Sequence, residues 1–123
     1  DSVRSEKLLT LISAADLGQS LVVHNSSCLA VETALGTDKM LYGLEILRKS
    51  GSLGHAGGIL YKAPKNNQNL FLDLPVIGKT TVEGVKKAGL NGIVIKHSNV
   101  AILNLEKTIE LANKLGIFIW SRK

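Results

Sequence analysis

Two short segments of the chain combine residue types that bind phosphate groups and divalent cations. The first, Gly36-Thr37-Asp38, stands where a helix is predicted to begin. The free backbone N–H groups and the positive dipole end of a helix N-terminus favour an anionic oxygen there. The Thr37 hydroxyl can donate to such an oxygen, and the Asp38 carboxylate can bind a divalent cation. Ordinary helix capping by Thr37 and Asp38 explains the same residues, and the pattern by itself favours capping.

The second segment runs from Lys62 to Gly78 and reads Lys-Ala-Pro-Lys-Asn-Asn-Gln-Asn-Leu-Phe-Leu-Asp-Leu-Pro-Val-Ile-Gly. It contains both prolines of the chain, the polar side chains of Lys65 and Gln68, and one aspartate, Asp73, flanked by leucines. A strand is expected before this segment and a helix after it. The segment is therefore either a site loop held on a scaffold or a long surface turn. Its pattern alone favours the surface turn.

The remaining candidates for chemistry carry weaker signals. His24, His55 and His97 fall in predicted turns or in the glycine-rich connection 51–58, without the i, i+4 spacing of a metal-binding pair. Cys28 lies in the apolar run Cys-Leu-Ala-Val. The sequence therefore predicts that Cys28 is a small core residue rather than a nucleophile.

The composition fits one globular domain and limits the classes of partner. The chain has 123 residues, of which 45% are hydrophobic and 20% charged, with a formal net charge of +5 and one cysteine. The positive charge favours an anionic partner. Nucleic acid is not expected, because the lysines are scattered and the few aromatic residues form no stacking platform. No apolar run approaches the roughly 20 residues of a membrane helix, and no signal peptide is apparent. A single cysteine fits a reducing compartment.

Hydrophobic spacing predicts helices that alternate with strands along the chain. Asn/Ser-rich turns after residues 23 and 95 indicate two hairpins, and a capping box formed by Thr80 and Glu83 is expected to begin the third helix. Trp120, in the last strand, is predicted to pack in the core or at a domain interface. These patterns predict a single α/β (or α+β) domain, with three to four helices packed on a mixed sheet of about six strands. The helices are expected at 5–17, 38–49, 80–88 and 105–115, and the strands at 20–23, 28–31, 59–63, 93–95, 100–103 and 117–120.

Three motifs occur in an order and at separations that match a known family. They are Ala30-Val-Glu with Gly36-Thr-Asp, Lys62-Ala-Pro-Lys with Gln68, and Asp73-Leu-Pro-Val-Ile-Gly. Together they resemble the carboxy-terminal domain of the UDP-2,3-diacylglucosamine pyrophosphatases of lipid A biosynthesis, the alphaproteobacterial type, formerly a domain of unknown function. The resemblance extends over essentially the whole chain. Asp16-Leu-Gly-Gln, Thr81-Val-Glu-Gly and Gly116-Ile-Phe-Ile-Trp agree as well.

The resemblance implies a reaction, a metal and a second domain. Enzymes of this family hydrolyse the diphosphate of UDP-2,3-diacylglucosamine, with water attacking the α-phosphorus, to UMP and 2,3-diacylglucosamine 1-phosphate. They depend on Mg²⁺ and hold the UDP-linked glycolipid between two domains. Residues 1–123 are thus expected to be the carboxy-terminal, catalytic half, with the amino-terminal domain absent. The resemblance also implies a cytoplasmic location, with peripheral contact to the inner membrane, and allows a homodimer.

Two aspartates are implied to carry the metal chemistry. Asp73 matches the aspartate most associated with catalysis in the family, as a ligand of Mg²⁺ or as the general base for the attacking water. Asp38 is the second candidate ligand, and Glu32 is a candidate to support the turn before it. Leu35 stands where the family usually has an acid, and Asn69 where it often has an aspartate. The two missing acids leave the set of metal ligands open.

The other matched positions are implied to contact the phosphates. Gly36 and Thr37 belong to the phosphate-side motif. Lys62, Lys65 and Gln68 belong to the lysine-rich motif, and the two lysines would supply positive charge where negative charge builds up in the transition state. A non-catalytic module that binds a nucleotide or phosphate is the alternative function, because the second domain and two of the family's acids are absent.

Overall fold

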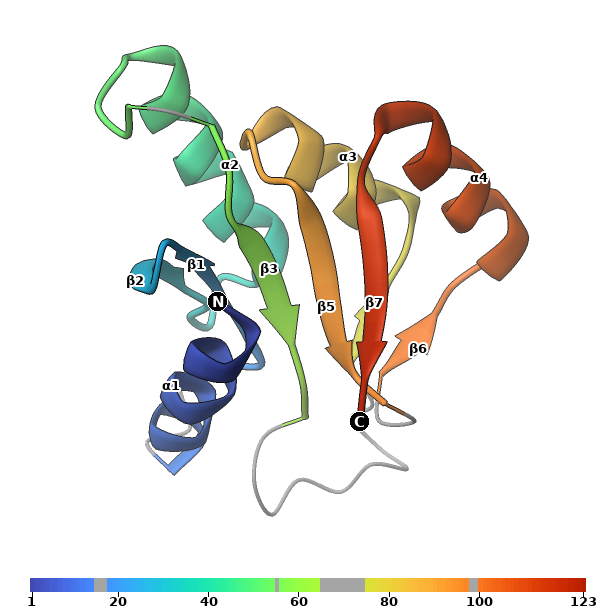
Figure 1. The fold of residues 1–123 in the computed structure, drawn as a ribbon, viewed down its shortest axis with the longest axis horizontal. Coiled ribbons are helices and arrows are strands. Elements are labelled where there is room, and N and C mark those ends of the chain that lie inside the picture. Colours follow the sequence, from blue (N-terminus) through green and yellow to red (C-terminus); the bar gives the residue numbers. More distant parts are fainter. Residues whose placement is uncertain (15–17, 55, 65–74, 98–99) are drawn as a thin grey trace.

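The computed structural model describes residues 1–14, 18–54, 56–64, 75–97 and 100–123. Within these ranges four helices pack with a mixed five-stranded sheet, and two short strands form a second sheet (Figure 1). The predicted single α/β domain is confirmed. The helices are α1 (Ser2–Ala14), α2 (Thr37–Lys49), α3 (Lys79–Lys87) and α4 (Leu105–Leu115). The strands are β1 (Ser20–His24), β2 (Ser27–Val31), β3 (Ile59–Lys62), β4 (Val76–Ile77), β5 (Gly92–Lys96), β6 (Ala101–Ile102) and β7 (Phe118–Arg122).

The larger sheet has the order β2-β1-β3-β5-β7. β1 runs antiparallel to both of its neighbours, whereas β3, β5 and β7 are parallel to one another. The β1–β2 connection is the first predicted hairpin, and it is confirmed. Asn25 and Ser26 turn the chain there with positive φ angles of 49° and 66°. The Asp1 carboxylate accepts hydrogen bonds from both of their backbone N–H groups, at 3.1 and 2.7 Å.

The second predicted hairpin is wrong, although both of its strands exist. Both edges of β5 are already occupied by parallel neighbours, β3 and β7. The segment expected to return beside β5 instead forms β6, which pairs in parallel with β4. The helices α3 and α4 thereby follow two neighbouring strands of the small sheet, which brings their N-termini to the same end of the molecule (Figure 1).

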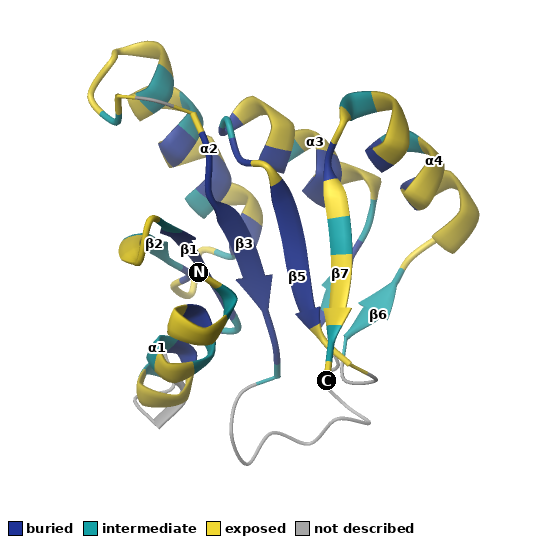
Figure 2. Cartoon of the chain, in the orientation of Figure 1, coloured by how far each residue is buried: buried dark blue, intermediate teal, exposed yellow. Residues whose placement is uncertain are grey.

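Two hydrophobic clusters cover the two faces of the large sheet, because side chains alternate along each strand. Val22, Leu60 and Ile93 point to one face, where they pack with α2, α3 and α4. Leu21 and Tyr61 point to the other face, which α1 covers. The central strands β3 and β5 are accordingly buried along most of their length, whereas β7 at the edge is largely exposed (Figure 2).

Three local predictions differ from the structure. Cys28 is exposed, because β2 is an edge strand whose first residues lie outside both clusters. Trp120 is 48% exposed and does not belong to the core, since α1 packs mainly on β1 and β3. Its predicted place at a domain interface stays a prediction. Helix α3 begins at Lys79, and its first turn is closed by Thr81, whose Oγ1 accepts the Gly78 N–H at 3.1 Å, not by the predicted capping box.

None of the described helices is both long and apolar enough to span a bilayer.

Arg48, near the end of α2, ties this helix to two neighbouring segments. Its Nε donates to the carbonyl oxygen of Ala88 at 3.0 Å, and its Nη2 donates to that of Gly57 at 2.9 Å. We expect Arg48→Met to lower the free energy of unfolding by about 1.5–3 kcal/mol, because hydrogen bonds from charged donors contribute about that much. Urea denaturation measures this change. Lys49→Met is the matched control, since among the described residues Lys49 forms its ion pair with Glu45 at the surface, and its loss should have no measurable effect. Equal effects of the two substitutions would contradict the assigned role.

Candidate functional site

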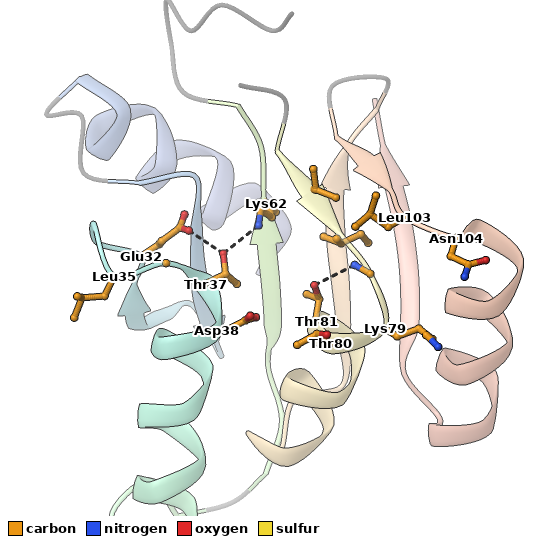
Figure 3. A pocket seen from close by; sticks show the side chains of 14 residues that line it. Glu32, Leu35, Thr37, Asp38, Lys62, Lys79, Thr80, Thr81, Leu103 and Asn104 are labelled. Carbon is orange, nitrogen blue, oxygen red and sulfur yellow. Dashed lines mark hydrogen bonds between the residues drawn. The ribbon is translucent and has the colours of Figure 1, made fainter. Parts of the chain in front are cut away.

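A cavity of about 510 Å³ opens where three helices begin (Figure 3). It lies beyond the carboxyl ends of β3 and β4, which is the usual place for ligands in open α/β sheets. Gly36, Gly78 and Asn104 precede α2, α3 and α4, and none of them caps its helix with a side-chain hydrogen bond. The cavity is lined by Glu32, Leu35, Gly36, Thr37, Asp38, Lys62, Val76, Ile77, Gly78, Lys79, Thr80, Thr81, Leu103 and Asn104.

A buried hydrogen-bonded chain of three side chains forms one wall of this cavity. Lys62, the last residue of β3, donates from Nζ to Thr37 Oγ1 at 3.1 Å. Thr37 in turn donates from Oγ1 to Glu32 Oε1 at 2.9 Å (Figure 3). All three residues are buried, with 7–8% of their surface exposed. The contact joins the end of a central strand to the first residue of α2, so it fixes the position of the Lys62 ammonium.

The Glu32 carboxylate is itself held from the other side. Its Oε2 accepts the backbone N–H of Gln19 at 2.6 Å, and the Glu32 N–H donates to the carbonyl oxygen of Ser20 at 2.9 Å. Gly18 passes so close that a Cβ atom at that position would lie 2.5 Å from the Glu32 carbonyl oxygen. Only glycine allows this approach without a shift of the backbone. The Glu32–Thr37–Lys62 chain is therefore anchored in the fold rather than on the surface.

Burial governs the protonation of Lys62. Desolvation lowers the pKa of the Lys62 ammonium below its ordinary value of 10.5, while the negative charges of Glu32 and Asp38 partly raise it again. The ammonium directs one of its three protons to Thr37, and no other described residue is recorded as an acceptor for it. A buried cation with donors directed into a cavity is suited to bind an anion.

The Thr37 hydroxyl has a different part in this arrangement from the one the sequence suggested. Its hydrogen goes to Glu32, and its oxygen accepts from Lys62 and lies 3.1 Å from the Ser20 hydroxyl. The hydroxyl is thus occupied by described residues. It orients Lys62, and the donors that Thr37 and its neighbours offer to a ligand are backbone N–H groups at the start of α2.

The structure brings four of the predicted site residues together. Gly36, Thr37, Asp38 and Lys62 all line the one cavity, although Lys62 is 25 residues from Thr37. Asp38 has an exposed side chain and points from α2 toward the start of α3 (Figure 3). The other three predicted residues, Lys65, Gln68 and Asp73, lie outside the described residues, so their convergence with this cavity stays a prediction.

The contributions of α3 and of the segment before α4 to the cavity were not predicted from the sequence. Lys79, Thr80 and Thr81 line it from the first turn of α3, and Leu103 and Asn104 from the start of α4. One signal was available, because Gly78-Lys79-Thr80 repeats the arrangement of a glycine directly before a helix that drew attention to Gly36. The site at Asn104 depends on the pairing of β6 with β4, which the predicted hairpin obscured.

Carboxylate oxygens, the type of ligand that Mg²⁺ uses, line the cavity, but the described part of the chain supplies few of them. No group of three or more His, Cys, Asp or Glu side chains is found there. Glu32 is occupied by Thr37 and Gln19. Asp38 is the cavity carboxylate without a hydrogen bond to another described residue, and Mg²⁺ commonly uses one or two carboxylates together with substrate phosphates.

Comparison with known proteins agrees with these features. The chain matches the family described as the LpxI C-terminal domain over residues 1–120. The chain belongs to this family. It is also similar to the UDP-2,3-diacylglucosamine pyrophosphatase LpxI of Caulobacter vibrioides, with 38% identity over 110 residues. The aligned part is 88% of this chain and 39% of that relative, so the chain spans about two fifths of the relative's length. The resemblance drawn from the three sequence motifs is thereby confirmed.

The buried position of Lys62 gives this LpxI C-terminal domain a testable pH dependence. The folded-state pKa of Lys62 lies below the unfolded value of 10.5, so the unfolded chain binds this proton more tightly. Its contribution to stability therefore becomes more favourable as the pH rises through the folded pKa toward 10.5. We expect Lys62→Met to raise the free energy of unfolding at pH 7 and to lose this advantage as the pH approaches 10.5. Guanidinium denaturation across that range measures it, and an advantage that grows with pH would contradict the burial argument.

Proposed function

We propose that this domain supplies the diphosphate-binding half of an enzyme that hydrolyses UDP-2,3-diacylglucosamine to UMP and 2,3-diacylglucosamine 1-phosphate. The observation that carries the proposal is the buried Lys62 ammonium at a cavity where three helices begin. The relative from Caulobacter is named as a pyrophosphatase of this substrate, which supports the same reaction class here. The remainder of the catalytic site would come from the complete gene product, including a second domain.

The cavity suits a diphosphate in charge and in size. The first turns of α2 and α3 line the cavity, and the backbone N–H groups and positive dipole end of a helix N-terminus favour an anionic oxygen. Lys62 adds a full positive charge from a buried site, where charge is poorly screened. Lys79 lines the same cavity from α3. The two phosphates of the substrate would thus lie between α2 and α3, with Lys62 beside them.

Hydrolysis gathers negative charge on the phosphate oxygens as water attacks the α-phosphorus. Lys62 is fixed by Thr37 and Glu32 before the substrate arrives, so it needs no reorganisation to stabilise that charge. Removal of one such preorganised donor commonly costs about 2.7–4 kcal/mol of activation free energy. Lys65 and Gln68 are proposed to add donors to the same phosphates.

Asp38 and Asp73 are proposed to hold a Mg²⁺ ion together with the substrate phosphates. When bound, Mg²⁺ would neutralise charge on the phosphate oxygens. Asp73 alternatively orients or deprotonates the attacking water. A homodimer, a cytoplasmic location and peripheral contact with the inner membrane remain predictions of the family resemblance.

Hydrolysis in ¹⁸O-labelled water tests the reaction and its direction of attack together. The complete gene product is incubated with UDP-2,3-diacylglucosamine and Mg²⁺, and the products are analysed by mass spectrometry. We expect the label in UMP, because attack at the α-phosphorus leaves the new oxygen on that phosphate. Label in the sugar phosphate would contradict attack at the α-phosphorus. Binding of the substrate without release of UMP would instead support the phosphate-binding module.

Substitution of Lys62 tests the residue that carries the proposal. Lys62→Met in the complete gene product should lower kcat by about 10²–10³-fold, as loss of a preorganised donor does, while the protein stays folded. Lys86→Met, at an exposed position of α3 outside the cavity lining, is the matched control and should retain full turnover.

Asp73→Ala should abolish release of UMP without unfolding the protein. Wild-type turnover in either active-site variant would remove that residue from its assigned role.

A further inference from the structure

A second groove lies directly beside the polar cavity, between β2 and α2. Its volume is about 360 Å³, and it shares Leu35 and Gly36 with the lining of the polar cavity. The two spaces therefore adjoin each other at the start of α2. The groove is lined by Leu29, Ala30, Val31, Thr33, Leu35, Gly36, Lys39, Met40, Gly43, Leu44 and Leu47.

The groove is apolar, in contrast to the cavity it joins. Its side-chain polar atoms come only from Thr33 and Lys39, and Leu44 and Met40 connect it to the core behind α2. Leu35, at the junction, is 77% exposed. It lies at the rim beside Glu32 and Thr37, on the other side of the cavity from Asn104 (Figure 3). A ligand with its phosphates at the start of α2 would pass Leu35 as it leaves the cavity on this side.

Gly43 lines the groove on the side of α2. It sits in the interior of α2, where glycine destabilises a helix relative to alanine. Packing between helices explains the other such glycine, Gly84, whose added Cβ would lie 3.1 Å from Leu41. An added Cβ at Gly43 would meet nothing within 4 Å. No described neighbour occupies this space, so a larger side chain at position 43 would extend into the groove that Gly43 lines.

We propose that this groove binds an acyl chain of the glycolipid whose diphosphate lies in the polar cavity. The inference rests on the proposed function, since an amphipathic ligand needs an apolar site next to a polar one. A peptide bound here would need hydrogen-bond partners for its backbone N–H and C=O groups, and the groove has few polar side-chain atoms to supply them. The hydrocarbon part of an acyl chain has no such requirement. Met40, an unbranched and adaptable side chain, suits contact with a flexible chain. Gly43 leaves room for the chain on the helix side.

A series of substrates with acyl chains of increasing length tests the groove in the complete gene product. For the wild type, KM should fall by up to about fourfold for each methylene group added, until the groove is filled. Gly43→Leu places a side chain in the groove and should raise KM for the long-chain substrate at least tenfold. Its kcat should stay near the wild-type value, and its preference should move to shorter chains. Ile46→Phe adds bulk on the same helix outside the groove lining, and it should leave the preference unchanged.

A measurement of contact complements the kinetics. Met40 is the only methionine of the 123 residues, so a ¹³C-methyl label, with its signal assigned by Met40→Leu, reports directly on the groove. Addition of substrate to the catalytically silent Asp73→Ala variant should shift this signal, and the shift should grow with acyl-chain length. UDP alone should leave the signal in place.

The outcomes separate this inference from the function on which it rests. If the wild type releases no UMP from any substrate, the proposed function fails, and the acyl groove fails with it. If the wild type is active but Gly43→Leu keeps the wild-type dependence on chain length, only the groove assignment is overturned. Gly43→Ala, which favours the helix without filling the groove, should keep the wild-type dependence on chain length, and a retained kcat of Gly43→Leu shows that its loss does not come from misfolding. A change of oligomeric state or of domain association in Gly43→Leu would make the groove a protein interface and overturn the inference.

Discussion

The contact between the Lys62 ammonium and the Thr37 hydroxyl organises the end of the molecule where the helices begin. It joins the last residue of a central strand to the first residue of a helix, and Glu32 completes the chain from the end of the β1–β2 hairpin. A buried ammonium is unfavourable by itself, and its partners among the described residues offset only part of that cost, since the pKa of Lys62 stays below its ordinary value. A bound anion would neutralise the Lys62 ammonium, whose burial lowers the stability of the fold in the absence of a ligand. Such a loss of stability at a functional site is common.

Three segments that are distant in sequence meet at this end because of the sheet topology. The parallel pairing of β3 and β5 places α2 and α3 side by side on one face, and the small β4–β6 sheet positions α4 next to them. Each helix then begins at the same cavity. Antiparallel pairing of β1 with β3 adds Ser20 and the neighbouring Glu32 from the other side. The polar cavity is therefore a property of the strand order rather than of one loop.

Sequence reasoning identified most elements and the Gly36–Asp38 and Lys62 parts of the site, because helix periodicity, glycine stops and local motifs are encoded over a few residues. It could not identify the partner of β6, since two short apolar strands carry no local sign of their pairing. For the same reason it missed Asn104. It predicted Trp120 in the core or at a domain interface, and the structure excludes the core. Exposure at an edge strand depends on how far α1 extends, which is set by tertiary packing. The sequence predicted that Glu32 supports the turn before Asp38. It did not predict the hydrogen bond that Glu32 accepts from the Thr37 hydroxyl.

The position of β7 has a consequence for the colloidal behaviour of this part of the protein. Among the described strands it ends the sheet, and Phe118, Ile119 and Trp120 follow one another along it, two of them about half exposed. An apolar strand with one unpaired edge is a template for pairing with another chain, which proteins usually counter with charge or coverage. Here the charges come at its end, with Arg122 paired to Glu6 of α1. Self-association of these 123 residues would accordingly begin at the tip of β7 that carries the aromatic rings, farthest from that ion pair.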